Sequence, residues 1–322
     1  MPNTQIEVYE DTPPVRQELA EYLVTAIDDP LSEADWQRSF EHWWDENPFA
    51  DLHAARGWTL RQDGHLAGFL ALIPVAYAVN GQKTPALAAS TWVMDPGCRN
   101  ASLPMFMKLQ RLGREVIIAD TTPSPEVQAL MDRSGWRSEK KVTRRYFPAL
   151  RGLSRGWPAM PGGTRIVTNM TEVRRLARPF QHGNRIEKWV TPESLRWQLA
   201  SPMHGHRFLG VIDDEGVLTS YVVLVDKPLR GIPAWLAMEA WTARETHEEL
   251  HAMIGAWLKG RVKTGLPWKP LLSANAFSPD PTWVDTPALH ARPLAVCHYF
   301  KVPEGRATLP KHTVMAEGDL AL

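Results

Sequence analysis

The stretch that decides the fold runs from residue 92 to residue 103 and reads Trp-Val-Met-Asp-Pro-Gly-Cys-Arg-Asn-Ala-Ser-Leu. It predicts a hydrophobic strand that ends at Asp95-Pro96, a turn over small residues, and a helix that begins near Asn100. Backbone N–H groups without partners gather at such a corner, at the positive end of the helix dipole. The stretch is therefore predicted to be an anion site, and a pyrophosphate is its natural ligand.

The composition favours an ordinary globular protein. Its 322 residues suit two domains, and 44% of them are hydrophobic. Lysine plus arginine and aspartate plus glutamate number 36 each, which argues against a dedicated nucleic-acid-binding protein. The only cysteines, Cys98 and Cys297, exclude a disulfide framework and suit a reducing compartment. Because signal-peptide and membrane-spanning patterns are both missing, we expect a soluble, cytoplasmic protein with no membrane partner.

Glycine and proline residues cluster at residues 151–163 and mark a linker there. Residues 1–150 and 164–322 are predicted to form one domain each. In the first half we predict helices at residues 14–26, from 32 onward, at 102–112 and at 125–135. We predict strands there at residues 5–9, 57–61, 66–79, 87–94, 115–119 and 142–147, the last of which closes the half.

The second half repeats this order of elements. We predict helices from residue 192 and at 245–259, and strands at 208–212, 219–225, 235–241, 271–274 and 294–302. Corresponding elements lie roughly half a chain apart, which indicates a degenerate tandem repeat. The expected fold class is α/β of the α+β kind, with a twisted mixed sheet flanked by helices in each half.

Two segments of the first half resemble the GNAT (Gcn5-related N-acetyltransferase) superfamily. Residues 93–103 are similar to the family's strand-ending loop with the pattern (Q/R)-x-x-G-x-(G/A). Residues 121–136, from Thr-Thr-Pro-Ser to Ser-Gly-Trp, resemble its strand–Asn–helix–Gly–(Phe/Tyr) segment. The order of elements in the whole chain is similar to tandem double-GNAT proteins, and the second half is assigned on that order alone.

This resemblance implies acyl transfer from acetyl-CoA or another acyl-CoA to the amine of a small molecule or peptide, bound between the two halves. It implies that the edge of the strand at Val93 and Met94 pairs with the pantetheine arm, and that Ser124 takes the place of the family's Asn. No metal is expected. The backbone N–H groups implied to hold the CoA pyrophosphate are those of Arg99, Asn100, Ala101, Ser102 and Leu103.

The sequence departs from the family pattern at four positions. Ser102 and Pro104 stand where two loop glycines are usual, and Pro104 has no N–H to donate. Ser124 replaces the Asn, and Met131 replaces the Tyr that often protonates the CoA sulfur. The strand at residues 87–94 also carries no acidic residue for the role of base.

Three residues are candidate bases. His42 and Glu46 lie on the helix that follows residue 32, and the resemblance implies that this helix borders the acceptor site. That helix also carries several tryptophans, which at helical spacing are more often core than pocket lining. Glu239 lies between apolar neighbours on the strand at 235–241, and a carboxylate in such a strand needs a partner or a function.

Two other functions are compatible with these observations. An aminoacyl-tRNA-dependent transferase of the Fem type also uses tandem GNAT-like domains, and it needs a basic channel for the tRNA end. A degenerate pair that binds a ligand without catalysis is the other alternative, favoured by the changes at Ser102, Pro104 and Met131. The basic run available for a channel comprises Arg137, Lys140, Lys141, Arg144, Arg145, Arg151 and Arg155.

Overall fold

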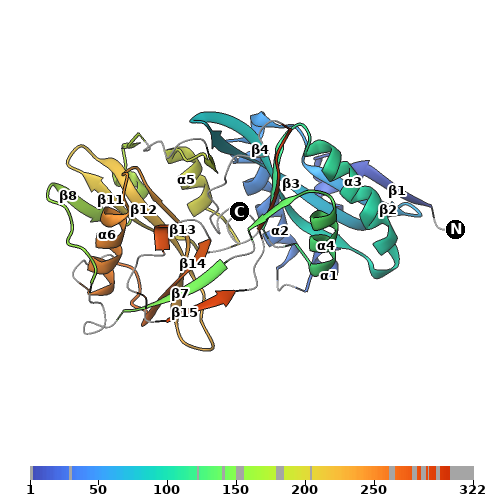
Figure 1. Cartoon of the computed structure of the whole chain (residues 1–322). Helices are drawn as coiled ribbons and strands as arrows, with labels where there is room; N and C mark the ends of the chain where they lie inside the picture. The colour runs from blue at the N-terminus through green and yellow to red at the C-terminus, as the bar shows by residue number, and fades with distance from the viewer. Residues whose placement is uncertain are drawn as a thin grey trace.

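The computed structural model places two mixed sheets next to each other, each covered by helices (Figure 1). This confirms the predicted α/β class with a twisted mixed sheet and flanking helices in each part. None of the described helices has the length and apolar character needed to cross a membrane. The structure describes residues 3–28, 31–121, 123–139, 142–149, 156–178, 185–203, 205–260, 265–277, 281–283, 288, 290–294 and 298–304.

The first sheet is antiparallel except for the pair formed by β4 and β5. A further strand, β10 (Ile186–Lys188), pairs with the far end of β3. In spatial order the sheet contains β1 (Thr4–Val8), β2 (Gly57–Gln62), β3 (His65–Val79), β4 (Gln82–Met94), β5 (Ile117–Asp120), β16 (His298–Lys301) and β6 (Arg137–Glu139).

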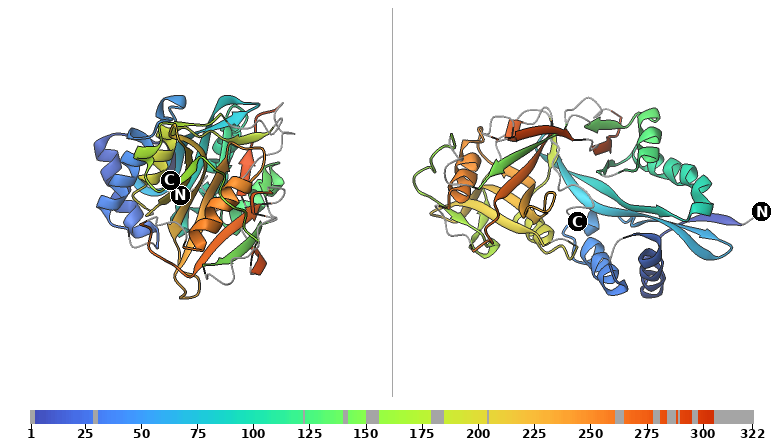
Figure 2. Two further views of the ribbon diagram at one scale, coloured as in Figure 1. Left: turned by 90° about the vertical axis from the view of Figure 1, so that its left-hand side faces the viewer. Right: turned by 90° about the horizontal axis from the view of Figure 1, so that it is seen from below.

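Helices cover both faces of this sheet (Figure 2, right). On one face lie α1 (Pro13–Ala26), α2 (Glu33–Phe40) and the π-helical turn η1 (Glu41–Asp45), whose tryptophans pack into the core as expected. On the other lie α3 (Ser102–Leu112) and α4 (Pro125–Arg133). A capping box begins α2 where a helix was predicted from residue 32 onward, because Ser32 and Asp35 exchange both hydrogen bonds.

The second sheet has the same plan. Its central parallel pair is formed by β13 and β14, the short β9 pairs in parallel with β12, and α6 (Glu248–Leu258) packs on one face with Trp157 and Leu272. The other face packs against α5 (Pro192–Leu199). In spatial order the sheet contains β15 (His290–Leu294), β7 (Val142–Pro148), β14 (Leu271–Phe277), β13 (Ala234–Thr242), β12 (Val217–Asp226), β11 (Arg207–Asp213) and β8 (Thr164–Val167), and β9 (Arg175–Leu176) pairs with β12.

The two halves exchange strands, which the sequence analysis did not predict. The strand expected to close the first half is β7, but it lies between β14 and β15 in the second sheet. Conversely, β16 lies between β5 and β6 in the first sheet. The hydrophobic side chains explain this placement, because Phe147 packs in the core under α6 while Phe300 packs against Ile117 and Ala119. Both closing strands were therefore predicted in the wrong sheet.

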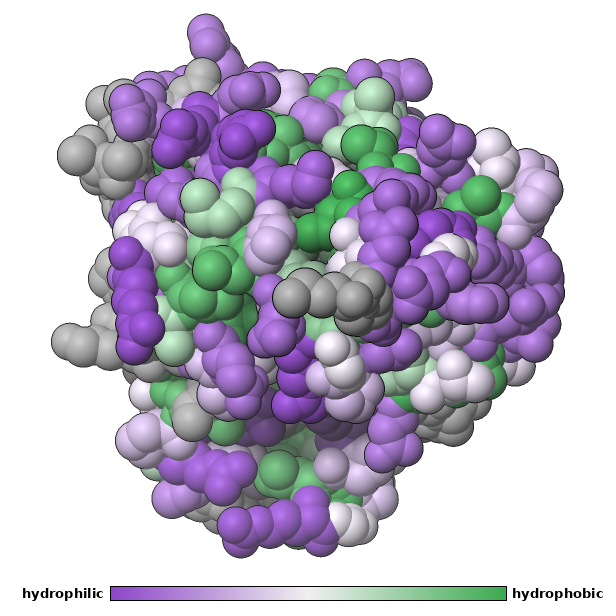
Figure 3. Space-filling model, turned by 90° about the vertical axis from the view of Figure 1, so that its right-hand side faces the viewer, coloured by the Kyte–Doolittle hydropathy of each residue, from purple (hydrophilic) through white to green (hydrophobic). Residues whose placement is uncertain are grey.

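Short irregular pieces complete the fold. They include η2 (Ala50–Leu52), η4 (Met170–Glu172) and η5 (Pro281–Trp283). The division of the chain at residues 151–163 stays a prediction, because residues 151–155 lie outside the described residues. Cys297 also lies outside them. Seen from the side of the N-terminus, the surface is mostly hydrophilic with small hydrophobic areas (Figure 3).

Candidate functional site

A pocket of about 370 Å³ opens where β4 and β5 part. The two strands pair in parallel from Ala86↔Ile117 to Ala89↔Asp120, and β5 ends there while β4 continues to Met94. Among the described strands, this last part of β4 pairs only with β3, so one backbone edge of it faces the pocket. The lining residues are Ala26, Ile27, Ala89, Ser90, Thr91, Trp92, Val93, Asp120, Pro123, Ser124 and Val127.

A β-bulge bends β4 at this pocket. The register with β3 shifts between Phe69 and Ala71, so that Thr91 and Trp92 together face one residue. Thr91 has a φ of 49°, in the left-handed region that a β-branched residue rarely adopts. Backbone strain of this kind gathers at ligand sites. The bulge was not predicted, because no glycine marks it in the sequence.

Two polar side chains stand at the end of the pocket. Asp120 is the last residue of β5 and is buried, at 7% exposure. Ser124 caps α4, accepting a hydrogen bond from the Val127 N–H at 3.4 Å and donating one to Glu126 at 2.8 Å. Ser124 directly precedes the helix predicted from residue 125, and the N-terminus of α4 contributes a partial positive charge beside the pocket. Asp120 was missed, although its place at the carboxyl end of a buried strand was a usable signal.

The corner that follows β4 is more tightly wound than predicted. Residues Pro96–Ala101 form the 3₁₀ helix η3, and α3 begins only at Ser102. The Cys98 N–H donates to the Asp95 carbonyl at 2.9 Å, and the Ser102 N–H donates to the Arg99 carbonyl. These two amides are therefore already bonded. A proline at the start favours this winding, since its φ is preset for a helical turn.

The predicted cofactor-binding residues thus fall into two groups. Val93 and Ser124 line the pocket. Met94 is the last residue of β4, and its sulfur accepts a hydrogen bond from the Ser102 hydroxyl at 3.0 Å. The remaining predicted residues follow it along the corner without lining the pocket: Arg99, Asn100, Ala101, Ser102 and Leu103.

His42 and Glu46 lie at the end of α2, outside the pocket lining. The His42 ring is fully buried and stacks on Trp197 with centroids 5.0 Å apart. Its Nδ1 lies 3.6 Å from Glu46, beyond hydrogen-bond range, and burial lowers the pKa of His42 to about 4. Both carboxylate oxygens of Glu46 accept hydrogen bonds from Arg38, at 2.7 and 3.0 Å.

Glu239 lies in the middle of the second sheet and has partners on two sides. Its Oε2 lies 2.5 Å from Lys188 Nζ, and its Oε1 accepts a hydrogen bond from the Tyr221 hydroxyl. Lys188 also donates to Gln198 at 2.7 Å. Burial, followed by the Glu239 charge, raises the pKa of Tyr221 well above its usual value. The three candidate bases are not brought together at the pocket, and their catalytic roles stay predictions.

The described part of the basic run is divided between the two sheets. Arg137 lies on β6 of the first sheet, with its guanidinium 4.7 Å from the Phe300 ring centre. Arg144 and Arg145 lie on β7 of the second. Arg144 Nε donates to Asn275 at 2.8 Å. A single channel is therefore not formed by these three, and Lys140, Lys141, Arg151 and Arg155 lie outside the described residues.

No protein-family model matches the chain, and no curated protein matches it. Solved structures do. A conserved protein of unknown function from Enterococcus faecalis, described as a probable N-acyltransferase, has a TM-score of 0.65 at 13% identity, over 93% of this chain and 72% of that one.

Two further structures are called GCN5-related N-acetyltransferases. The protein from Anabaena variabilis has a TM-score of 0.61 at 10% identity, over 92% of this chain and 72% of its own. The protein from Kribbella flavida has a TM-score of 0.57 at 12% identity, over 92% and 71%. The likeness extends over both halves of this chain, which shows that the fold is GNAT-like, as the sequence resemblance implied.

Proposed function

We propose that the chain is an acyl-CoA-dependent N-acyltransferase whose donor binds in the pocket between β4 and β5. The observation that carries this proposal is the free edge of β4 beyond Ala89, exposed to the pocket where its parallel neighbour ends. An extended ligand with amide groups can add to such an edge as a further strand. The pantetheine arm of CoA has this chemistry, and the GNAT-like fold supports the assignment.

Helices α3 and α4 follow β4 and β5, the strands of the parallel pair, and a helix N-terminus suits the charged end of the donor. Of these, the N-terminus of α4 adjoins the lining residue Ser124 and carries a partial positive charge. The bulge at Thr91 and Trp92 interrupts the β3–β4 ladder, so a backbone N–H there is placed to polarise the thioester carbonyl. The acyl chain then lies toward Ala26 and Ile27, at the end of α1.

The reaction proposed is direct attack by the acceptor amine on the thioester carbonyl. A C–N bond forms, the C–S bond breaks, the amine loses one proton and the CoA thiolate gains one. Asp120 is the carboxylate among the lining residues, and we assign it the task of accepting the amine proton. Entry of the acceptor between the two halves and the roles of His42, Glu46 and Glu239 stay predictions.

The test is binding of acetyl-CoA and of longer acyl-CoAs by calorimetry, with a pair of variants on α1. Ala26→Trp fills the pocket, whereas Val24→Trp adds the same side chain at a position that is 38% exposed and does not line it. We expect wild type and Val24→Trp to bind equally and Ala26→Trp to bind at least about tenfold more weakly, because overpacking costs about 1–3 kcal/mol. Absence of binding by every acyl-CoA contradicts the proposal.

A second candidate function is acyl-CoA binding without turnover. It is favoured by Met131, which occupies the position of the family's tyrosine acid and is fully buried in the core. A thioether there donates no proton to a leaving thiolate. Release of free CoA thiol in the presence of an amine panel separates the two functions, and Asp120→Asn should abolish that release while leaving acyl-CoA binding within about twofold if the chain is an enzyme.

A further inference from the structure

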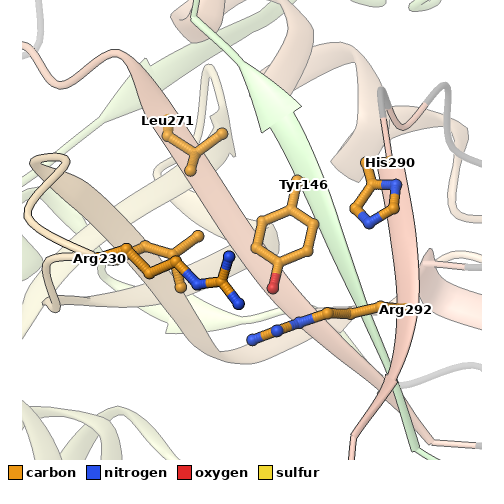
Figure 4. Close-up of a pocket in the computed structure, with 6 residues that line it drawn as sticks. Tyr146, Arg230, Leu271, His290 and Arg292 are labelled. Atoms are coloured by element: carbon orange, nitrogen blue, oxygen red, sulfur yellow. The ribbon is translucent and has the colours of Figure 1, made fainter.

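A second pocket, of about 230 Å³, lies on the second sheet (Figure 4). It is formed by β7, β14, β15 and the tight turn between β12 and β13. No carboxylate is among the residues that the structure describes around it. The lining residues are Tyr146, Leu229, Arg230, Leu271, His290 and Arg292.

This pocket is not a second copy of the donor pocket. The donor pocket lies where a parallel strand pair ends, beyond Ala89↔Asp120. In the second sheet the parallel pairing runs from Ala234↔Leu271 to Ala237↔Ala274, and the pocket lies at Leu271, where that pairing begins. The tandem repeat of the fold therefore does not account for it.

Two arginines stand opposite each other beside the pocket. On the neighbouring strands β7 and β15, Arg144 pairs with Arg292 and Tyr146 pairs with His290. Residues two apart on a strand share a face, so all four project to one side. Like charges directly opposite each other destabilise a sheet. Burial lowers the pKa of Arg144, and the nearby Arg292 lowers it further.

The Arg292 side chain has capacity for a ligand. Its Nε is buried and has no hydrogen-bond partner among the described residues. The guanidinium carbon lies 5.8 Å from the centre of the Tyr146 ring. An unsatisfied buried donor on a cation is costly, and an anion bound at this guanidinium would offset that cost through its opposite charge.

A constrained turn supplies the second cation. Leu229 and Ile232 exchange backbone hydrogen bonds of 2.9 and 3.0 Å around Arg230-Gly231, whose φ angles are 49° and 80°. Both central residues of this turn are left-handed, which is the geometry that favours Asn or Gly and not Arg. Figure 4 shows the Arg230 side chain directed toward the hydroxyl end of Tyr146, with Arg292 approaching the same end.

We propose that this pocket binds a small organic anion, with its carboxylate or phosphate group between Arg230 and Arg292 and its apolar body against Leu229, Leu271 and the Tyr146 ring. Guanidinium groups match the geometry of both oxyanions. A cavity of about 150 Å³ is sufficient for benzene, so this pocket has room for one substituted ring. The site is separate from the proposed donor pocket and does not depend on it.

Calorimetric titration of the full chain tests the site with four probes: benzoate, phenyl phosphate, inorganic phosphate and the neutral benzamide. We expect at least one of the two aromatic anions to bind about tenfold or more tightly than benzamide and inorganic phosphate. The aromatic anion that binds more tightly shows whether the site prefers a carboxylate or a phosphate. Arg230→Gln and Arg292→Gln should each weaken that probe by about tenfold or more, while Arg175→Gln, an exposed control on β9, should leave it unchanged.

The ring resonances of Tyr146 and His290 locate the ligand. They should shift on addition of the preferred probe to wild type and to Arg175→Gln, and not in Arg292→Gln. The proposal is overturned if neither aromatic anion binds, if benzamide binds as well as they do, or if both arginine variants retain wild-type affinity. It is also overturned if CoA displaces the probe, because the pocket would then belong to the donor.

Discussion

Lys188 Nζ lies 2.5 Å from Glu239 Oε2, and this ion pair joins the two sheets. Lys188 is on β10, which pairs with β3 of the first sheet, and Glu239 is on β13 in the second. The Glu239 side chain is 3% exposed, and the Tyr221 hydroxyl occupies its other oxygen. The contacts within the protein thus satisfy the carboxylate that the sequence marked as a candidate base.

Breaking this pair should destabilise the protein more than removing both charges. We expect Lys188→Met to cost about 3–5 kcal/mol of unfolding free energy, because it leaves the buried Glu239 charge without its cation. The double variant Lys188→Met with Glu239→Gln should regain most of that loss. Urea unfolding of the single and double variants measures both. If Lys188→Met has the same free energy of unfolding as the wild type, the ion pair does not stabilise the contact between the two sheets.

The strain at Thr91 predicts a stabilising substitution. Thr91→Asn should raise the unfolding free energy by about 1 kcal/mol, since Asn adopts the left-handed region more readily than a β-branched residue. Thr91→Val keeps the branching and should show no gain. Urea midpoints at unchanged m-value report the difference. Equal midpoints for the two variants would show that the φ of 49° at residue 91 lowers the free energy of unfolding very little.

The exchanged strand β16 should control the donor pocket. Tyr299 pairs with Asp120 and Lys301 with Ile118, so β16 holds the end of β5. Phe300 is 1% exposed in the core beside Ile117, and Phe300→Ala should cost about 3–5 kcal/mol. Amide exchange at residues 118–120 should rise and acyl-CoA binding should weaken. Glu304→Gln, exposed and beyond the strand, is the control. If amide exchange at residues 118–120 is unchanged in Phe300→Ala, then β16 does not stabilise the pocket.

The features that the sequence predicted correctly are those set by local interactions. The helices predicted from residues 32, 125 and 192 begin within one residue of those positions, because each start is set by a cap, Ser32, Ser124 or Thr191, that depends on residues within three positions of it. Strand exchange depends instead on contacts between distant parts of the chain. The sequence of β7 or of β16 does not say which sheet the strand joins, because each sheet has an apolar core that buries the strand's phenylalanine.

The candidate site was predicted only in part, again because local features are readable in the sequence and long-range contacts are not. Val93 and Ser124 follow from the strand–turn–helix order, and both line the donor pocket. The amides from Arg99 to Leu103 were expected to be free, but the chain winds into a 3₁₀ helix that bonds some of them internally. Asp120 directly follows the strand predicted at residues 115–119, which was a usable signal, but its place in the pocket lining depends on where β5 ends beside β4 in the folded sheet.

The buried imidazole of His42 predicts a specific loss of stability in acid. Burial lowers its pKa from 6.5 to about 4, with Glu46 opposing the shift, so between these values the unfolded chain binds the proton that the folded chain rejects. Unfolding free energy therefore falls as pH decreases from 6.5 to 4, by up to about 3 kcal/mol from this group, and is unaffected by it above that range.

Phenylalanine can keep the stack on Trp197, which has an interplanar angle of 15°, without titrating. His42→Phe should therefore match the wild type at pH 7.5 to within about 1.5 kcal/mol and lose less stability by pH 4.5. Urea unfolding at both pH values measures this, and parallel pH profiles for the two proteins would show that the folded chain accepts the proton at His42.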